Sequence, residues 1–309
     1  MSLRLTILGC HSATPRSHAH PSSQFLEING ECLLIDCGEG TQTQLRKFKI
    51  KFSKIKRVFI SHLHGDHFFG LIGLISTFSL LNRNSELHIY GPKGIKEIIL
   101  TQLKLSKSWL EYPLFFHELE SSSSQLIFEN DKIEVHTIPL KHRIYTNGFL
   151  FKEKSQPRKL NMQAISKYSE IDICDYQNIK NGKNFSLSDG TEIDNKLLTN
   201  DPPGPVSYAY CSDTSYFEKT ADITREVNLL YHESTFLDQH QSLATITGHS
   251  TAKEAARIAR KAKAGKLILG HYSSRYKDLN LFLNEAKTHF DNVELCEAGK
   301  VFEVVNSYS

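Results

Sequence analysis

Short apolar runs separated by turn-forming residues dominate the first third of the chain and recur to its end. Runs rich in β-branched and aromatic side chains and bounded by such residues are typical of β-strands. The second and third runs are joined by Asn29-Gly30, whose two positions suit the positive φ angles of a tight hairpin turn. The pattern predicts strands over residues 3–8, 24–28, 32–37, 58–60, 87–90, 133–138, 148–151, 206–211, 229–231 and 267–269.

The pattern also predicts helices in three segments. Residues 41–52 form one, and residues 70–81, which are apolar on nearly every side, form a second that is buried. A longer helix is predicted over residues 251–264. Its N-cap is Ser250 or Thr251, and Glu254 lies three residues after Thr251, which is the spacing of a capping box.

Residues 152–204 differ in character from the sequence on either side. They are mostly polar, lack aliphatic periodicity and end in Asp-Pro-Pro-Gly-Pro. A loop of this length inside a compact domain is usually functional or partly disordered. We interpret it as an inserted arm with its own small hairpin, and residues 1–309 as a single domain that carries this arm.

The composition fits a folded chain of one large domain or two small ones. Of 309 residues 39% are apolar, and 37 Lys and Arg against 34 Asp and Glu leave a net charge of +3. That total alone does not indicate a nucleic-acid binder. The longest mostly apolar run, residues 68–81, is shorter than the roughly 20 residues that cross a bilayer, so we expect no membrane partner.

The cysteines indicate a reducing compartment. All six (positions 10, 32, 37, 174, 211 and 296) are scattered and form no Cys-x-x-Cys pair, which is typical of reduced thiols in a cytosolic protein. The first nine residues have a strand pattern closed by Gly9, without the long apolar region and cleavage site of a secretory leader. We therefore expect a cytoplasmic protein.

The chain has 15 histidines, and the densest group directly follows the strand predicted over residues 58–60. Alternate residues leaving a strand point the same way, so His62 and His64 can converge on one ion. Asp66 and His67 follow the next turn and can reach a second ion. Imidazole and carboxylate ligands suit Zn²⁺, with Mn²⁺ or iron as alternatives. The plain alternative is a polar loop that only caps the next helix.

Further ligand-type residues stand at the ends of later apolar runs, and they are His142, Asp213, Glu233 and His271. Each alone has a plain interpretation: Asp213 as a cap, His142 as a loop residue and His271 as a core imidazole. Together with the histidine-rich motif they supply the two histidines and the bridging carboxylate that a two-metal site needs. Two ions roughly 3.5–4 Å apart activate water and clamp both oxygens of an in-line displacement, so the sequence predicts a hydrolase.

Six blocks of sequence carry a family resemblance. They are Asp-Cys-Gly-Glu-Gly-Thr-Gln-Thr-Gln (36–44), Phe-Ile-Ser-His-Leu-His-Gly-Asp-His-Phe-Phe-Gly-Leu (59–71), Tyr-Cys-Ser-Asp-Thr (210–214), His-Glu-Ser-Thr-Phe (232–236), Gly-His-Ser-Thr-Ala (248–252) and Leu-Gly-His-Tyr-Ser-Ser-Arg-Tyr (269–276). In this order they resemble the motifs of the metallo-β-lactamase superfamily and, within it, the ribonuclease Z family of tRNA 3′-processing endonucleases. The second block fixes only the superfamily, whereas the first, fourth and fifth indicate the family.

The resemblance implies an α/β (α+β) fold, the four-layer αβ/βα sandwich with metals at the sheet edges. It also implies a ligand set, with His62, His64 and His142 on one zinc, Asp66, His67 and His271 on the other, and Asp213 bridging. In the same family pattern Asp66 accepts the proton of the attacking water. His249 stabilises the transition state or protonates the leaving 3′ oxygen, and Glu233 orients His249.

The function implied by the resemblance is a zinc-dependent endoribonuclease with two Zn²⁺ per chain. It removes the 3′ trailer from precursor tRNA and leaves a 3′ hydroxyl on the tRNA and a 5′ phosphate on the trailer. A homodimer is also implied, in which the arm of one subunit helps the other hold tRNA. The alternatives are a general two-zinc phosphodiesterase or exoribonuclease on the same fold, and an idle binding subunit, which loss of metal ligands would mark.

Basic residues are the candidates for RNA contacts. Residues 46–57 hold seven cations and no acid, and Arg46, Lys47 and Lys49 begin this run. The plain alternative is a solvated helix face. Arg275 closely follows a predicted metal ligand and is a candidate for a phosphate contact. The arm intersperses basic and acidic residues where the family has a basic, Gly-Pro-rich tip, so it is either a divergent tRNA-binding exosite or a weaker one.

Overall fold

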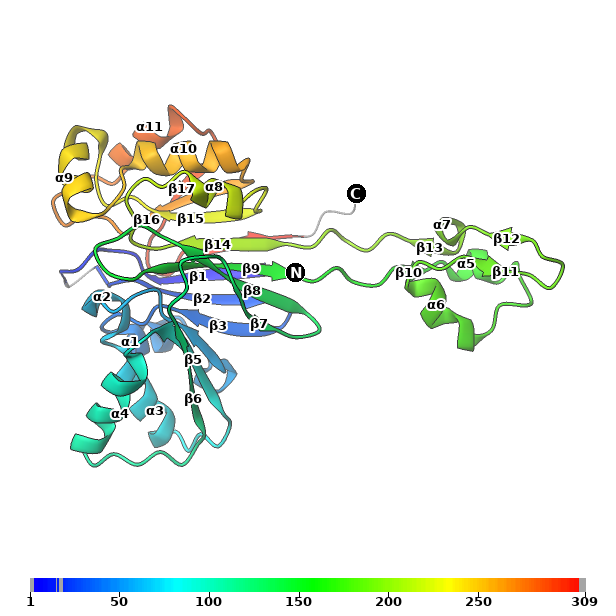
Figure 1. The fold of residues 1–309 in the computed structure, drawn as a ribbon, viewed down its shortest axis with the longest axis horizontal. Helices are drawn as coiled ribbons and strands as arrows, with labels where there is room; N and C mark the ends of the chain where they lie inside the picture. The colour runs from blue at the N-terminus through cyan, green and yellow to red at the C-terminus, as the bar shows by residue number, and fades with distance from the viewer. Residues whose placement is uncertain (1–2, 15, 17–18, 306–309) are drawn as a thin grey trace.

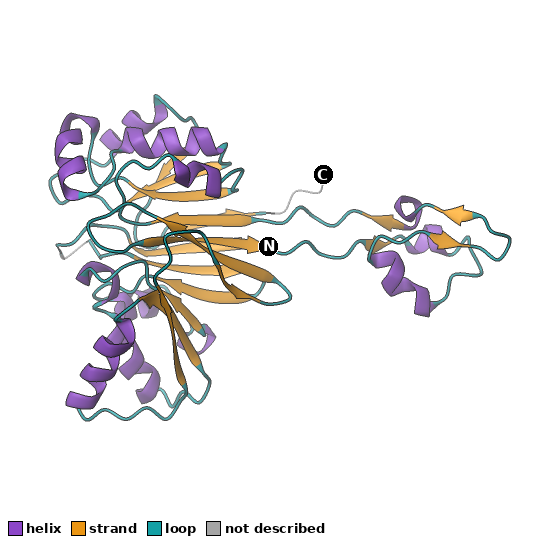
Figure 2. Ribbon diagram, in the orientation of Figure 1, coloured by secondary structure: helices purple, strands orange, loops and turns teal. Residues whose placement is uncertain are grey.

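The computed structural model describes residues 3–14, 16 and 19–305, whose path is drawn in Figure 1. Across these residues, two large sheets of seven strands each lie face to face. Helices cover the outer face of both sheets, as the colouring of Figure 2 shows. The layers run helix, sheet, sheet, helix, which confirms the predicted four-layer sandwich.

The first sheet joins an antiparallel half to a parallel half. Its strands in spatial order are β18 (Val301–Val304), β1 (Leu3–Gly9), β2 (Ser23–Ile28), β3 (Glu31–Ile35), β4 (Arg57–Phe59), β5 (Leu87–Pro92) and β6 (Leu114–Leu119). Pairing is antiparallel from β18 to β3 and parallel from β3 to β6. The predicted hairpin joins β2 to β3, and both turn residues have positive φ, 46° at Asn29 and 82° at Gly30.

The second sheet has the same mixed character. Its strands in spatial order are β17 (Val293–Leu295), β16 (Lys266–Gly270), β15 (Leu229–Glu233), β14 (Ser207–Cys211), β9 (Asn147–Glu153), β8 (Ile133–Pro139) and β7 (Leu126–Glu129). Strands β14 to β17 pair in parallel, and β14, β9, β8 and β7 pair antiparallel. Since two antiparallel steps restore direction, β8 points the same way as β14.

The outer helices fall into two groups (Figure 1). The helices on the side of the first sheet are α1 (Thr41–Lys47), η1 (Phe52–Lys54), α2 (Gly65–Phe68), α3 (Leu71–Leu80) and α4 (Ile95–Leu105). The second group is α8 (Lys219–Ile223), η3 (Asp238–His240), α9 (Gln241–Thr247), α10 (Ala252–Ala262) and α11 (Asn280–Lys287). On the described part of the chain no helix has the length and apolarity needed to pass through a membrane.

Alternating side chains of the strands build the cores. In β4, Phe59 belongs to the core between the sheets, where it packs against Phe149 and Phe151 of β9. Its neighbour Val58 points to the other face and joins a second core with Leu74 of α3. This period-two alternation over buried positions fixes the register of the strand that leads into the histidine motif.

Helix α1 ends earlier than the helix predicted over residues 41–52. Lys49 has φ 57°, and the backbone N–H of Lys49 and of Ile50 donate to the carbonyls of Arg46 (3.0 Å) and Leu45 (2.9 Å). This pair of bonds is a Schellman ending, which normally uses glycine and here forms at a lysine. The prediction of one helix to residue 52 is therefore wrong, because the chain turns away after Lys47.

The cap of α10 was predicted as Ser250 or Thr251, and it is Thr251. The Thr251 hydroxyl accepts from the backbone N–H of Glu254 at 3.2 Å, and the Glu254 carboxylate accepts from the backbone N–H of Thr251 at 2.9 Å. Both bonds of the predicted capping box are present. The box fixes the entry of α10 directly after the Gly248-His249 turn.

Between β9 and β14, residues 154–205 project from the two-sheet body as an arm on two extended segments (Figure 1). Its elements are β10 (Lys159–Leu160), α5 (Met162–Ile165), η2 (Ile173–Asp175), α6 (Tyr176–Lys180), β11 (Phe185–Ser186), β12 (Glu192–Ile193), α7 (Asn195–Leu198) and β13 (Thr199–Asn200). Strands β11 and β12 form a small hairpin. The arm has an apolar cluster of its own, made of Ile165, Ile171, Ile179, Ile193 and Leu198.

Candidate metal centre

The residues predicted to bind metal come together at one edge of the molecule, where strands of both sheets end. The histidine motif follows β4, His142 follows β8, Asp213 follows β14 and His271 follows β16. Functional side chains in α/β sheets usually lie outside the carboxyl ends of parallel strands. Since β8 runs the same way as β14, its end reaches the same edge.

One cluster contains His62, His64, His142 and Asp213, whose candidate ligand atoms all lie within 4.8 Å of one another. Nδ1 of His64 lies 3.0 Å from Nε2 of His62 and 3.3 Å from Nε2 of His142. Oδ2 of Asp213 lies 3.5 Å from Nε2 of His62. Three imidazole nitrogens and a carboxylate oxygen around one point form a donor set that suits zinc.

The second cluster contains Asp66, His67 and His271. Oδ2 of Asp66 lies 3.5 Å from Nε2 of His67 and 3.4 Å from Nε2 of His271. The other carboxylate oxygen of Asp213, Oδ1, lies 3.3 Å from each of these two nitrogens. Asp213 therefore presents one oxygen to each cluster.

Two atoms of this centre show that the residues fit a cation. Nε2 of His67 and Oδ1 of Asp213 are buried and have no hydrogen-bond partner within the described structure. An unsatisfied buried polar atom costs roughly 1–3 kcal/mol, which coordination would offset. Burial, followed by the charge of His67, lowers the pKa of His62 to about 4, so its imidazole is neutral and keeps a lone pair for a metal. The donor set therefore supports a metal cofactor.

The outward nitrogens of two histidines are held by hydrogen bonds. Nδ1 of His142 donates to the carbonyl of Gly248 at 2.7 Å, and Nδ1 of His271 lies 2.8 Å from Oγ1 of Thr235. A Cβ at position 248 would stand 3.0 Å from Nδ1 of His142, and φ there is 75°, so this close approach requires glycine. Partners of this kind orient the ring and leave Nε2 facing the cluster.

Asp36 belongs to the centre although the sequence pattern assigns it no role. It follows β3 with φ 54° and is fully buried. Its carboxylate accepts from the backbone N–H and hydroxyl of Ser61 (2.7 and 2.9 Å), the hydroxyl of Tyr210 (2.6 Å) and Nδ1 of His67 (2.7 Å). In the sequence Asp36 is the next-to-last residue of the strand predicted over residues 32–37, and nothing in that local pattern distinguishes it. Asp36 thus positions the loop that carries His62.

Asp36→Asn is expected to lower metal affinity about 10- to 100-fold, the usual loss when a partner behind a ligand is removed. The amide group replaces an oxygen that accepts hydrogen bonds, so Nδ1 of His67 loses its anionic partner. Competition with a chromophoric chelator measures the affinity, and circular dichroism monitors the fold. The exposed Asp222→Asn is the matched control, and equal affinities of the two variants would contradict the role of Asp36.

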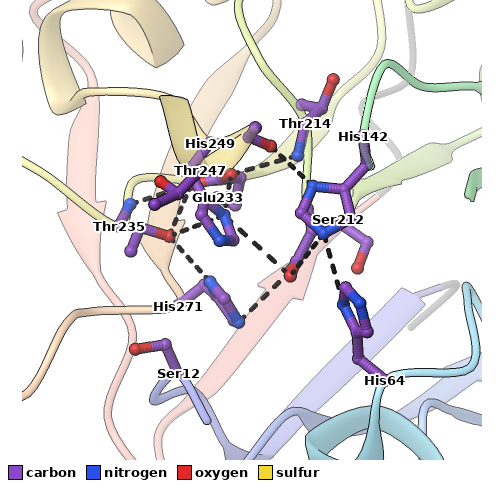
Figure 3. Close-up of polar contacts among 12 residues, drawn as sticks. Ser12, His64, His142, Ser212, Thr214, Glu233, Thr235, Thr247, His249 and His271 are labelled. Carbon is purple, nitrogen blue, oxygen red and sulfur yellow. Dashed lines mark hydrogen bonds and ion pairs between the residues drawn. The ribbon is translucent and has the colours of Figure 1, made fainter. Parts of the chain in front are cut away.

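Glu233, the last residue of β15, is fully buried and accepts five hydrogen bonds. The backbone N–H groups of Thr214, Thr235 and Ser250 donate at 3.1, 2.9 and 3.1 Å, and the Thr235 hydroxyl donates at 2.8 Å. The fifth donor is Nδ1 of His249 at 2.8 Å. In Figure 3 Glu233, Thr235 and His249 gather on one side of the site, with His142 and His64 on the other.

His249 stands between this carboxylate and the metal ligands. Burial would lower the pKa of His249, but the charge of Glu233 and its hydrogen bond outweigh burial and raise that pKa to about 9. Its Nδ1 also lies 4.0 Å from Oδ2 of Asp213. With Asp213 and His271 it forms a third group of possible ligand atoms within 4.8 Å, so the geometry permits a proton donor or a ligand here.

A pocket of about 490 Å³ opens onto both clusters. His64, Asp66, Asp213 and His271 line it together with His249. The N-terminal loop after β1 also lines it and touches a predicted ligand, because the backbone N–H of residue 13 donates to a carboxylate oxygen of Asp66 at 2.8 Å. The pocket is thus open to a substrate that must reach both clusters.

The four basic residues predicted to contact RNA are exposed and lie outside the lining of this pocket. Arg46 and Lys47 end α1, and Lys49 follows in the turn. Arg275 lies one residue beyond Ser274, which does line the pocket. The structure therefore brings together the predicted ligands but does not bring these four cations to them.

Comparisons with known proteins agree with this site. A family model described as "Anti-Pycsar protein Apyc1" matches residues 3–155. Ribonuclease Z of Porphyromonas gingivalis is 44% identical over 284 residues, which cover 92% of this chain and 93% of that protein. Ribonuclease Z of Cytophaga hutchinsonii is 44% identical over 313 residues, covering 100% of this chain and 98% of that protein.

Solved structures show the same relationship. The crystal structure of human tRNase Z, short form, matches with a TM-score of 0.71 and 29% identity, covering 98% of this chain and 99% of that one. The metallo-β-lactamase fold protein YhfI of Bacillus subtilis matches with a TM-score of 0.68 and 20% identity, covering 97% and 98%, which shows the fold alone. Identity above 40% over nearly the full length of both chains means that this chain belongs to the ribonuclease Z family.

Proposed function

We propose that this chain is the endoribonuclease that removes the 3′ trailer from precursor tRNA. Cleavage leaves a 3′ hydroxyl on the tRNA and a 5′ phosphate on the trailer. The observation that carries this proposal is the convergence of the seven predicted ligands on two adjacent clusters, in a chain with full-length ribonuclease Z relatives. The phosphodiester of an RNA backbone is a substrate that two neighbouring cations suit.

The proposed cofactor is a pair of zinc ions. His62, His64 and His142 would hold one ion and Asp66, His67 and His271 the other, and Asp213, which has one oxygen near each cluster, would contribute to both. When bound, such a pair supplies Lewis acidity toward the scissile phosphate and lowers the pKa of water.

The remaining steps fall to side chains. Asp66, which lines the pocket and belongs to the second cluster, accepts the proton of the attacking water. Burial would raise the pKa of Asp66, but the charge of His67 and the hydrogen bond from His271 outweigh burial and hold that pKa below its usual range, so the carboxylate is ionised. His249, protonated at neutral pH by virtue of its raised pKa, donates a proton to the leaving 3′ oxygen. Glu233 orients the ring through its bond to Nδ1 and keeps the imidazolium charged.

The test is a cleavage assay on a 3′-extended precursor tRNA beside bis(p-nitrophenyl) phosphate, with zinc content measured on the same sample. Cleavage at the discriminator base with about two zinc ions per chain is the expected result. Activity on the small ester alone would favour the alternative, a general two-zinc phosphodiesterase, and would overturn the tRNA assignment.

We also propose that residues 152–204 form the tRNA-binding arm of a single-domain body. The arm projects away from the body and builds its own apolar cluster, so it presents a surface beyond the pocket (Figure 1). Residues 154–205 hold seven basic and seven acidic residues, hence no net charge. Its grip on RNA therefore depends on individual contacts more than on bulk attraction.

Replacing residues 155–205 by an Asn-Gly turn is expected to lower kcat/KM on precursor tRNA by about 10²-fold or more, because a second contact site on the same substrate is lost. Strands β9 and β14 pair antiparallel, with Lys152 opposite Ser207, so a short turn can join them. Hydrolysis of bis(p-nitrophenyl) phosphate and the melting temperature report on the body. Unchanged tRNA cleavage would contradict the role of the arm.

Other predictions from the sequence accompany this proposal. Arg46, Lys47 and Lys49 form an exposed basic surface at the C-terminal end of α1, and Arg275 lies near the pocket; we propose that each contacts the RNA backbone. A homodimer and a cytoplasmic location stay predictions. An RNA partner is supported by the ribonuclease Z relatives.

A further inference from the structure

Arg143 directly follows the predicted ligand His142 and lies where a substrate must pass. It lines the pocket beside both clusters, and among the described residues that line this pocket it is the one lysine or arginine. The other formally charged side chains there, apart from histidines, are the carboxylates of Asp66 and Asp213. A cation placed beside two carboxylates would ordinarily pair with one of them.

Arg143 does not pair. Its side chain is exposed and has no ion pair or hydrogen bond with any residue in the described part of the chain. Its stem passes close to Gly248, where an added Cβ would lie 3.5 Å from Cγ of Arg143. The stem thus lies beside the Gly248-His249 turn at the mouth of the pocket, and the guanidinium is left free among the described residues.

A free guanidinium at the entrance of a site for a polyanion is suited to phosphate. Its planar fork donates two parallel hydrogen bonds to phosphate oxygens, which an ammonium group cannot match. Arg275, the arginine that the sequence places near the metal ligands, lies outside the pocket lining. The structure thus favours Arg143 over Arg275 as the arginine beside the reacting bond.

We propose that Arg143 binds the RNA phosphate next to the scissile one and so sets the register of the strand across the two clusters; this rests on the proposed tRNA-processing function. The scissile phosphate must face both clusters, whose members His62, His67 and Asp213 are buried. Arg143 is exposed at the rim on the His142 side. It is therefore a substrate-binding residue for the neighbouring phosphate and does not contact the reacting atoms.

The experiment compares Arg143→Ala, Arg143→Lys and the control Lys141→Ala on precursor tRNA and on bis(p-nitrophenyl) phosphate. Lys141 is exposed, lies two residues away and is outside the pocket lining, so its loss removes the same charge without the contact. We expect Arg143→Ala to lower kcat/KM on tRNA about tenfold to hundredfold, mainly through KM. Its activity on the small ester, which has no neighbouring phosphate, stays within about twofold of the parent.

The salt dependence gives a second readout. Log(kcat/KM) falls with log salt in proportion to the phosphates contacted, so the slope for Arg143→Ala is smaller than that of the parent by about 0.7–0.9. Arg143→Lys is expected to have the salt slope of the parent, because the charge is kept, but a KM between those of the parent and Arg143→Ala. A slope equal to that of Lys141→Ala, or equal losses on both substrates, would overturn the proposal. Failure of the parent itself to cut precursor tRNA would instead overturn the proposed function.

Discussion

Asp213→Asn is expected to lower precursor tRNA cleavage by roughly 10³- to 10⁵-fold and to reduce bound zinc in the same preparation. Asp213 is the residue whose two oxygens face the two clusters, at 3.5 Å from His62 and 3.3 Å from His67 and His271. An amide offers one neutral oxygen in place of two anionic ones, so it cannot serve both clusters. Cleavage rate and zinc content are measured together.

The substitution preserves volume, so the fold is expected to survive, and the melting temperature of the apo-protein checks this. Asp222→Asn removes a carboxylate from the surface, where it lies 3.5 Å from Arg225, and provides the matched control. Parent-like turnover with two zinc ions in Asp213→Asn would show that the bridging assignment is wrong.

His249→Ala is expected to keep the metals and to slow precursor tRNA cleavage by about 10²- to 10⁴-fold, through kcat, as for a lost general acid. Glu233 retains four other donors in this variant, from Thr214, Thr235 and Ser250, so its buried carboxylate is not left unpaired. The effect is therefore on proton transfer and not on folding. Single-turnover rates and zinc content are the measurements.

A change of leaving group separates the two roles that the geometry allows for His249. The p-nitrophenolate of the small ester leaves without a proton, so a general acid contributes little there, and His249→Ala loses far less activity on it than on tRNA. His289→Ala, which removes an imidazole beyond α11, is the control. Loss of zinc from His249→Ala would identify a ligand, since His249 groups with Asp213 and His271.

The sequence predicts the metal ligands better than it predicts the residues that hydrogen-bond to those ligands and position them. His62, His64, Asp66 and His67 are recognisable because four ligand types crowd the end of one strand, a local pattern. Asp36 is not recognisable in this way. Its four hydrogen bonds come from residues 25 to 174 positions away, and only the folded sheets bring these residues together. A ligand motif is short in sequence, whereas the groups behind it are defined by tertiary packing.

The limits of the fold prediction have similar causes. The early end of α1 depends on a left-handed lysine at position 49, where composition gives none of the usual glycine signal. The strands β6, β7, β17 and β18 were not predicted. All four lie at the edges of their sheets. Half-exposed positions blur the apolar pattern in β6, β7 and β18, and β17 has only three residues. The buried central strands were predicted, within a few residues at each end.

Two extended segments connect the arm to the body, and the apolar cluster of the arm is separate from both main cores. Free-energy effects of substitutions at distant sites with no common partners are nearly additive. Changes in the arm and changes at the strand edge that holds the metals can therefore accumulate independently. Mutations in the arm can therefore change substrate preference during evolution, while selection on the two-sheet body maintains the hydrolytic chemistry.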